Sequence, residues 1–439
     1  MGGGLLQLVA YGAQDVYLTG NPQITFFKVV YRRHTNFAIE AIEQTFMGTP
    51  AFGSTSYVVV SRNGDLINRV YLQLSLPPLR DYVFGNDTVD RYVNYIGQKI
   101  VSSVTIEIGG QQIDKHYSDW LYIWNELSLP LGKKYGYEQM VGADGDIVSG
   151  RNVLSSAATK NDQYTSLYVP FEFWFCRNVG LSLPLIALQY HEVKFKIQFE
   201  ELGKCVCKPG SGAAASTNTK EDLANLQAKL WIDYIFLDTD ERRRFAQNSQ
   251  EYLIEQLQSQ TEVLSASSGN NIRLNFNHPC KELIWVAKPT DYGAHHWYNY
   301  TSAKNVADYE TSYVSGSSNA SLSTSNVVNL VYPTGPNPFT KCLLKLNAND
   351  RFAERDGSYF NYVQPYQHHT NIPKNRGINV YSFALKPEEH QPSGSLNMSR
   401  IDTAMLYLTS SVSGNVSIYA VNYNVLRIMS GMGGLAYSN

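Results

Sequence analysis

The sequence predicts an all-β fold: a tandem double jelly roll, made of two eight-stranded antiparallel β-sandwiches with short helices and long surface loops. Three observations predict it. The chain of 439 residues is rich in Tyr and Phe, which favour strands, whereas charged residues make up only 17%. Short alternating segments are separated by tight-turn signals such as Asn63-Gly64 and Gly109-Gly110. These segments also occur as two similar series, without the strand-helix alternation of a parallel sheet.

The internal repeat carries most of this prediction. NFAIEAIEQTF, beginning at Asn36, matches EYLIEQLQSQT, beginning at Glu251, and DLINRVYLQLSLP at Asp65 matches ELIWVAKP at Glu282. Three further pairs of segments follow in the same order. A chain of this length exceeds the size at which a single core stops growing, about 250 to 300 residues, so two similar domains are expected.

The elements follow in chain order. A short amphipathic helix is predicted over 114–127, where Trp120 and Trp124 lie four residues apart, and long loops over 128–163, 205–218 and 288–340. The first series of strands is predicted at 37–46, 57–61, 67–76, 104–108, 168–175, 193–199 and 230–237. The second is predicted at 252–258, 272–276, 283–287, 343–346, 380–385, 403–408 and 416–428.

The stretch 230–258 predicts the boundary between the two repeats, because a strand, a charged helical run and a new strand follow one another there. Its densest basic run is Arg242, Arg243 and Arg244, interpreted as a solvated helix face or as a contact with an acidic partner. The predicted division is an extended arm at 1–26, a first jelly roll at 27–238, a connecting helix at 239–250, and a second jelly roll with a C-terminal tail at 251–439.

Charge and hydropathy exclude several classes of protein. The net charge is −2, and no Lys or Arg precedes Lys28, so a basic arm for nucleic acid is missing. The longest apolar run, 179–188, is too short to cross a bilayer, and the first ten residues lack a signal-peptide pattern. Five cysteines fit a reducing compartment, and Cys205 and Cys207 are interpreted as loop thiols.

No motif predicts catalysis. The P-loop, GxSxG, HExxH and dinucleotide-binding patterns are absent, so no catalytic, cofactor or metal residue is predicted and the chain is not expected to be an enzyme. The adjacent pairs His295-His296 and His368-His369 are interpreted as surface or interface residues. Asn299 and Asn319, in the largest predicted loop, are candidate glycosylation sites.

Two other function classes remain open at this point. A carbohydrate-binding β-sandwich, such as an attachment protein, would use the loop residue Trp297 as an exposed stacking platform. A β-sandwich hydrolase is the third class, although no pair of acidic residues stands out for it.

Several long motifs resemble one family: YGAQDVYLTGNPQITFFKVVYRR from Tyr11, GLSLPLIALQYHEVK from Gly180, DYIFLDTDERRRFAQ from Asp233, RLNFNHP from Arg273 and NYNVLRIMSGMGGLAY from Asn422. These motifs are similar to those of the major capsid proteins of nucleocytoplasmic large DNA viruses, closest to the algal-virus type. The resemblance runs almost end to end and weakens mainly in the predicted loops.

The resemblance implies a structural protein of the virion. Members of this family are double jelly rolls that form homotrimeric, pseudo-hexagonal capsomers and tile an icosahedral shell. It further implies neighbouring capsomers as partners, minor capsid and penton proteins on the inner face, and an internal membrane beneath the shell. The arm is expected on the inner side, without direct binding to nucleic acid. Surface glycans on the outer loops, late synthesis and assembly in the host cytoplasm are also implied.

Overall fold

The computed structural model describes residues 3–10, 12–77, 83–84, 87–88, 91–148, 165–207, 226–266, 269–290, 292, 296–303, 333 and 335–437. By its internal contacts the chain forms two units, Met1–Phe37 and Ala38–Asn439. The first unit contains two short helices, α1 (Gly3–Val9) and α2 (Val16–Thr19). The prediction of an extended arm with turns is therefore wrong for these two segments, because apolar runs without proline close helical turns before Asn21-Pro22.

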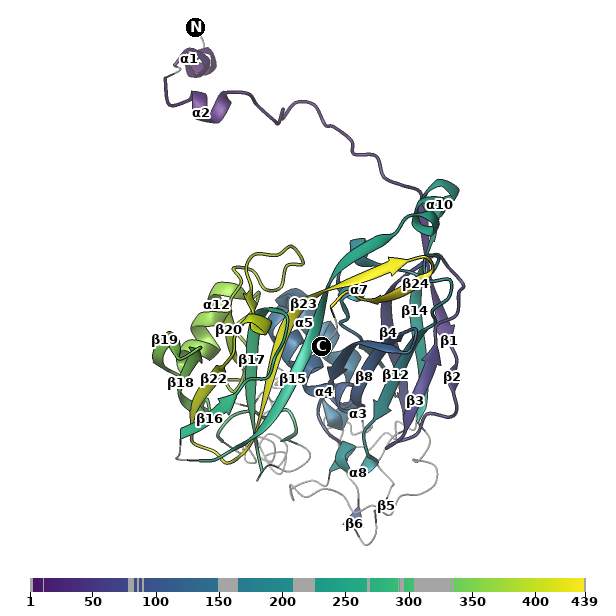
Figure 1. The fold of residues 1–439 in the computed structure, drawn as a ribbon, viewed down its shortest axis with the longest axis vertical. Helices are drawn as coiled ribbons and strands as arrows, with labels where there is room; N and C mark the ends of the chain where they lie inside the picture. Colours follow the sequence, from purple (N-terminus) through teal and green to yellow (C-terminus); the bar gives the residue numbers. More distant parts are fainter. Residues whose placement is uncertain are drawn as a thin grey trace, which may run out of the picture. The chain divides into compact units, whose positions relative to one another are not determined.

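Two β-sandwiches make up the second unit (Figure 1). In the first, one sheet has the order β1-β14-β4-β10 and the other the order β2-β3-β12-β8-β9. Their apolar side chains alternate inward and form one core between the sheets. The strands are β1 (Phe37–Gln44), β2 (Phe46–Met47), β3 (Thr55–Val59), β4 (Leu66–Leu76), β8 (Val101–Ile108), β9 (Gln111–Tyr117), β10 (Thr165–Pro170), β12 (Val193–Phe199) and β14 (Gln227–Leu237).

The second sandwich repeats this arrangement. One sheet has the order β15-β23-β17-β20 and the other the order β16-β22-β18-β19, around a separate core. The strands are β15 (Gln250–Leu264), β16 (Gly269–Arg273), β17 (Pro279–Pro289), β18 (Phe339–Leu346), β19 (Asn349–Asp356), β20 (Asn379–Ser382), β22 (Ala404–Ser410) and β23 (Gly414–Met429). Apart from the additional two-residue strand β2, this order corresponds to that of the first sandwich. The predicted double jelly roll is confirmed.

Helices occupy the same place in both repeats. Between β9 and β10 lie α4 (Ser118–Ser128) and α5 (Leu131–Val141). Between β19 and β20 lie the π-helical turn η4 (Tyr359–Val363) and α12 (Gln364–His368). The predicted helix at 114–127 begins four residues late, because 111–117 pair with β8 as strand β9. The predicted loop at 128–163 contains α5.

The shorter elements complete the chain. Helix α10 (Thr239–Gln247) lies between β14 and β15, and its N-cap residue Asp238 accepts a hydrogen bond from the Thr239 backbone N–H at 2.7 Å. The others are β5 (Val83–Phe84), β6 (Asp87–Thr88), β7 (Arg91–Tyr92), α3 (Ile96–Ile100), α6 (Gly145–Val148), α7 (Trp174–Arg177), η1 (Val179–Leu181), β11 (Leu183–Pro184), α8 (Leu202–Cys205), β13 (Val206–Cys207), β21 (Leu396–Asn397), η5 (Met398–Arg400) and β24 (Met432–Leu435).

Candidate functional site: the interface between the two sandwiches

A third apolar core joins the two sandwiches. Helix α4 lays Trp120 and Trp124, both 3% exposed, on the outer face of sheet β15-β23-β17-β20. The ring of Trp120 lies 5.7 Å from that of Tyr419 on β23, and Ile284 and Val286 of β17 belong to the same cluster. Inward-facing residues of β17 fill the core of the second sandwich, so this sheet is buried on both faces. Burial of several aromatic rings fixes the two sandwiches against each other.

The second sandwich also supplies hydrogen bonds to the end of α4. The last carbonyl groups of a helix have no partner within the helix. Here the backbone N–H of Asn371 donates to Leu127 O at 3.0 Å, and the Asn371 side-chain amide donates to Leu129 O. The backbone N–H of Lys374 donates to the carboxylate of Glu126 at 3.3 Å. A loop of the second sandwich therefore caps the C-terminal end of the helix that covers this sandwich.

Buried ion pairs cross the interface. Arg177 of α7 lies 2.6 Å from the carboxylate of Glu255 on β15, and the ammonium of Lys281 on β17 lies 2.7 Å from the same carboxylate. Burial raises the pKa of Glu255, but the charges of Arg177 and Lys281 outweigh it and hold that pKa below its ordinary value. Burial dominates for Lys281, whose side chain is fully buried, and lowers its pKa. One carboxylate thus bridges two cations from different sandwiches.

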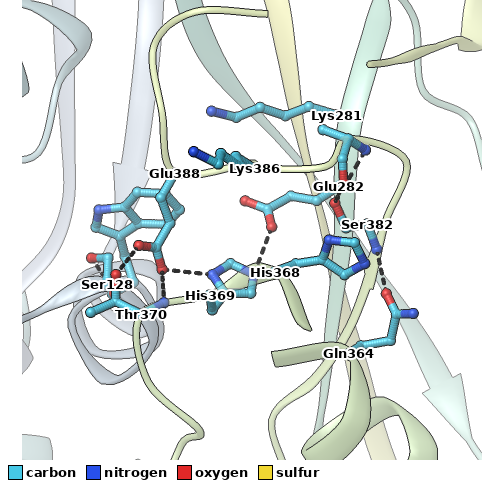
Figure 2. Close-up of polar contacts among 12 residues, drawn as sticks. Ser128, Lys281, Glu282, Gln364, His368, His369, Thr370, Ser382, Lys386 and Glu388 are labelled. Carbon is cyan, nitrogen blue, oxygen red and sulfur yellow. Dashed lines mark hydrogen bonds and ion pairs between the residues drawn. The ribbon is translucent and has the colours of Figure 1, made fainter. Parts of the chain in front are cut away.

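His369, which follows α12, lies between two carboxylates (Figure 2). Its Nε2 is 3.0 Å from Glu282 on β17, and its Nδ1 is 2.8 Å from Glu388. Glu388 also accepts the backbone N–H of Thr370 at 3.0 Å. Burial lowers the pKa of His369, but the charges of Glu282 and Glu388 outweigh burial and raise the pKa to about 9. His369 is therefore a buried cation at neutral pH, rather than a surface residue.

The C-terminal hairpin attaches the second sandwich to the first. Strand β24 pairs with β23, and the imidazole Nδ1 of His191 lies 2.9 Å from the backbone oxygen of its residue Gly433. The backbone N–H of Tyr190 donates to Gly431 O at 2.9 Å. A Cβ atom at Gly433 would lie 2.6 Å from the side chain of Leu188, so any larger residue there would force the buried Leu188 side chain to move.

The structure places the other sequence-predicted residues as follows. Arg242, Arg243 and Arg244 lie on α10, where Arg242 pairs with Asp65 at 2.9 Å and Arg244 with Glu241 at 3.5 Å. No described contact brings these arginines to the buried ion pairs.

The two glycosylation candidates differ. Asn299 is 4% exposed, and its side-chain amide donates to Ala303 O at 3.0 Å while its oxygen accepts the Thr301 N–H. A glycan on that nitrogen has no room in the folded chain, so the prediction at Asn299 is corrected. Asn319 lies outside the described residues.

Three predicted loop residues are less exposed than expected. Trp297 is partly buried: its indole N–H donates to Asn94 O at 2.9 Å, and Lys99 lies over its ring at 5.4 Å. The predicted stacking platform is therefore already occupied. Cys205 is fully buried at the end of α8, which corrects its interpretation as a loop thiol, and His296 is also buried.

A cavity of about 390 Å³ lies beside the start of α4. Its charged side chains are already paired, Lys99 with Glu200 at 3.3 Å and Lys288 with Asp119. Within the described ranges, no group of three or more His, Cys, Asp or Glu residues is placed to hold a metal ion. None of the helices described is long and apolar enough to cross a membrane.

Comparison with known proteins agrees with this architecture. A family model described as "Major capsid protein N-terminus" matches residues 25–238, and one described as "Large eukaryotic DNA virus major capsid protein" matches residues 241–434. The chain is 49% identical to the major capsid protein of Pyramimonas orientalis virus and 45% identical to that of Paramecium bursaria Chlorella virus 1, in each case over 100% of both chains.

Solved structures extend this agreement to three dimensions. The quasi-atomic model of the PBCV-1 virus capsid contains a chain with 37% sequence identity and a TM-score of 0.76, matched over 94% of this chain and 100% of that chain. The relatives named are structural capsid proteins, which favours the structural role over a carbohydrate-binding attachment protein. The chain belongs to the family of major capsid proteins of large eukaryotic DNA viruses.

Proposed function

We propose that this chain forms a homotrimer, a pseudo-hexagonal capsomer whose copies tile an icosahedral shell. The observation that carries the proposal is the shared aromatic core, in which α4 packs on the sheet of the second sandwich. It makes two equivalent sandwiches behave as one body with a fixed angle between them. Three such bodies around a three-fold axis place six sandwiches in a ring, and head-to-tail contacts generate a closed ring when the rotation between copies closes.

This proposal assigns a role to each segment of the chain. The first jelly roll spans 27–238 and the second 251–439, and the connector at 239–250 acts with the shared aromatic core to hold the angle between them. The arm at 1–26 faces the inside of the shell, toward minor capsid and penton proteins and an internal membrane that the chain itself does not cross. The absence of basic residues before Lys28 supports a partner other than nucleic acid.

Other parts of the proposal concern the surface and the cell. Trimers form in the host cytoplasm and join neighbouring capsomers through contacts weaker than those within the trimer, so that misplaced capsomers dissociate again. The chain has no enzymatic role. Asn319 remains a candidate glycan acceptor, and peptide mass spectrometry of protein from virions, before and after deglycosylation, tests it.

Light scattering of the purified full chain at micromolar concentration and neutral pH tests the trimer. The expected mass is three times the 49.3 kDa of one chain. An obligate interface of more than about 2,000 Å² keeps such a trimer intact at these concentrations. A mass of one chain under these conditions contradicts the proposal.

A further inference from the structure

The two repeats contain two equivalent helix–sheet pairs, and the single chain uses only one of them. The helices between β9 and β10 cover the outer face of sheet β15-β23-β17-β20 in the other sandwich. The equivalent helices of the second sandwich are η4 and α12, and the equivalent sheet of the first is β1-β14-β4-β10. In the second unit, α12 lies on one side and strands β1, β14 and β4 lie on the other (Figure 1).

The outer face of β1-β14-β4-β10 carries aromatic rings at the positions that α4 covers in the second sandwich. Trp231 of β14 is paired with Tyr71 of β4, just as Tyr419 of β23 is paired with Ile284 of β17. The rings of Trp231 and Tyr71 stack with centroids 6.5 Å apart, and Tyr168 of β10 lies 6.2 Å from Tyr71.

This face remains open in the single chain. Tyr168 is 37% exposed and Ile39 of β1 is 52% exposed, whereas Tyr419 in the covered sheet is 3% exposed. Two of the charges on this face pair with each other, Lys229 with Glu43 at 3.0 Å. An aromatic sheet face of this kind is unusual on an isolated protein and indicates an interaction surface.

The outer face of η4 and α12 is aromatic as well. Tyr362 and Tyr366 lie four residues apart, as Trp120 and Trp124 do on α4, and therefore share one helix face. Tyr366 is 76% exposed, in contrast to the 3% of Trp124. Val363, beside them, is also exposed.

We propose that η4 and α12 of one copy dock on the outer face of sheet β1-β14-β4-β10 of a second copy, repeating between chains the contact that α4 makes within the chain. The proposal rests on the homotrimer proposed above and names the surfaces that close it. The contact is heterologous, since each copy offers a helix on one side and a sheet on the other, and such contacts close into rings. It predicts that all six neighbouring pairs of sandwiches in the ring meet in nearly the same way.

Two substitutions with matched controls test these surfaces in the full chain. Tyr366→Glu and Tyr168→Glu each place a charge in the proposed contact, and each should raise the concentration at which the oligomer dissociates by at least about tenfold. The control for the helix is Tyr135→Glu on α5, at a residue 60% exposed, and the control for the sheet is Tyr57→Glu, at a residue 39% exposed. Both controls should keep the wild-type oligomer. Circular dichroism spectra like that of the wild type verify that all four variants fold.

Mixing the two variants gives a sharper result. The Tyr366→Glu copy has an unaltered sheet face, and the Tyr168→Glu copy has unaltered helices. The helices of the second can therefore dock on the sheet of the first, which leaves one intact contact between them. Mass photometry of the mixture should show a dimer that neither variant forms alone, and no closed trimer. A full trimer from either variant alone, at the wild-type dissociation concentration, overturns the inference.

Cross-linking provides an independent readout that does not disturb assembly. A Tyr366→Cys copy mixed with a Tyr168→Cys copy should give a cross-linked dimer with a flexible bis-maleimide, whereas Tyr57→Cys in place of Tyr168→Cys should not. Cross-links of equal yield in both mixtures also overturn the inference. If the wild-type chain is itself a monomer, the proposed homotrimer fails; if it is a trimer that tolerates both substitutions, only the docking surfaces fail.

Discussion

Arg177 of the first sandwich and Glu255 of the second form an ion pair of 2.6 Å, and the buried ammonium of Lys281 contacts the same carboxylate. Glu255→Gln removes the negative charge and leaves two buried or half-buried cations without their partner. Loss of one member of a buried ion network costs about 3 kcal/mol. Denaturant unfolding of the variant should show this decrease in the free energy of unfolding.

The same strand supplies the control. Glu251 of β15 pairs with Arg427 at 2.7 Å, but both side chains are more than half exposed. Glu251→Gln should therefore change the free energy of unfolding by less than about 1 kcal/mol. Equal effects of the two substitutions contradict the stabilising role assigned to the pair between the sandwiches.

The buried His369 predicts a loss of stability at alkaline pH. Its pKa is raised to about 9 in the folded chain, from an ordinary value of 6.5. Its contribution is therefore fully present below pH 6.5 and is lost as the pH rises through about 9. At 1.36 kcal/mol per pKa unit the contribution is on the order of 3 kcal/mol. Unfolding midpoints measured from pH 6 to pH 10 should fall over this window.

His369→Gln is the variant that separates this residue from other groups that titrate. Glutamine cannot gain a charge, so the variant should be less stable than the wild type at pH 6 and should approach it at pH 10. Parallel pH profiles for the two proteins assign the alkaline loss of stability to another group.

The hairpin of β23 and β24 leaves little room for a side chain at Gly433. Gly433→Ala places a methyl group 2.6 Å from the buried Leu188, whereas Gly434→Ala meets only the flexible end of Gln111 at 3.3 Å. Overpacking of this kind costs about 1 to 3 kcal/mol, so only the first substitution should destabilise the chain. Hydrogen exchange at 188–191 and 432–435 should accelerate in Gly433→Ala and remain unchanged in Gly434→Ala.

The connector predicts an effect on assembly rather than on folding. A Gly-Ser linker in place of Arg242 to Gln247 removes a helical segment whose only described buried partner is Asp65, so each sandwich should fold while trimer or lattice formation is impaired. Mass measurement and thermal unfolding check the two parts. Replacement of the three arginines by glutamine keeps the helix and should preserve assembly; if it abolishes assembly instead, contact with an acidic partner explains the basic run.

Much of the fold could be predicted, because strand periodicity and the repeat are local signals. The strand predicted at 67–76 is observed as Leu66–Leu76, and the one predicted at 230–237 ends at Leu237 as expected. The helix predicted after β9 begins too early. Apolar and polar residues alternate only weakly over 111–117, and the pairing of this strand with β8 depends on tertiary structure.

The interface could not be predicted from the sequence. Arg177 and Glu255 are distant along the chain, and nothing in either local pattern distinguishes a buried charge from a solvated one. The four-residue spacing of Trp120 and Trp124 predicts one apolar helix face, but the periodicity of a helix does not reveal that this face packs on the other repeat. One local pattern does indicate a contact surface: Tyr362 and Tyr366 of the second repeat have the same four-residue spacing as Trp120 and Trp124 of the first.

Cryo-electron microscopy of the purified oligomer shows directly which surfaces of neighbouring copies are in contact. We expect three copies in a ring of six sandwiches, with Tyr366 of each copy packed over Trp231 and Tyr168 of the next. A ring in which η4 and α12 face solvent, with the sheet β1-β14-β4-β10 covered by something else or left bare, contradicts it.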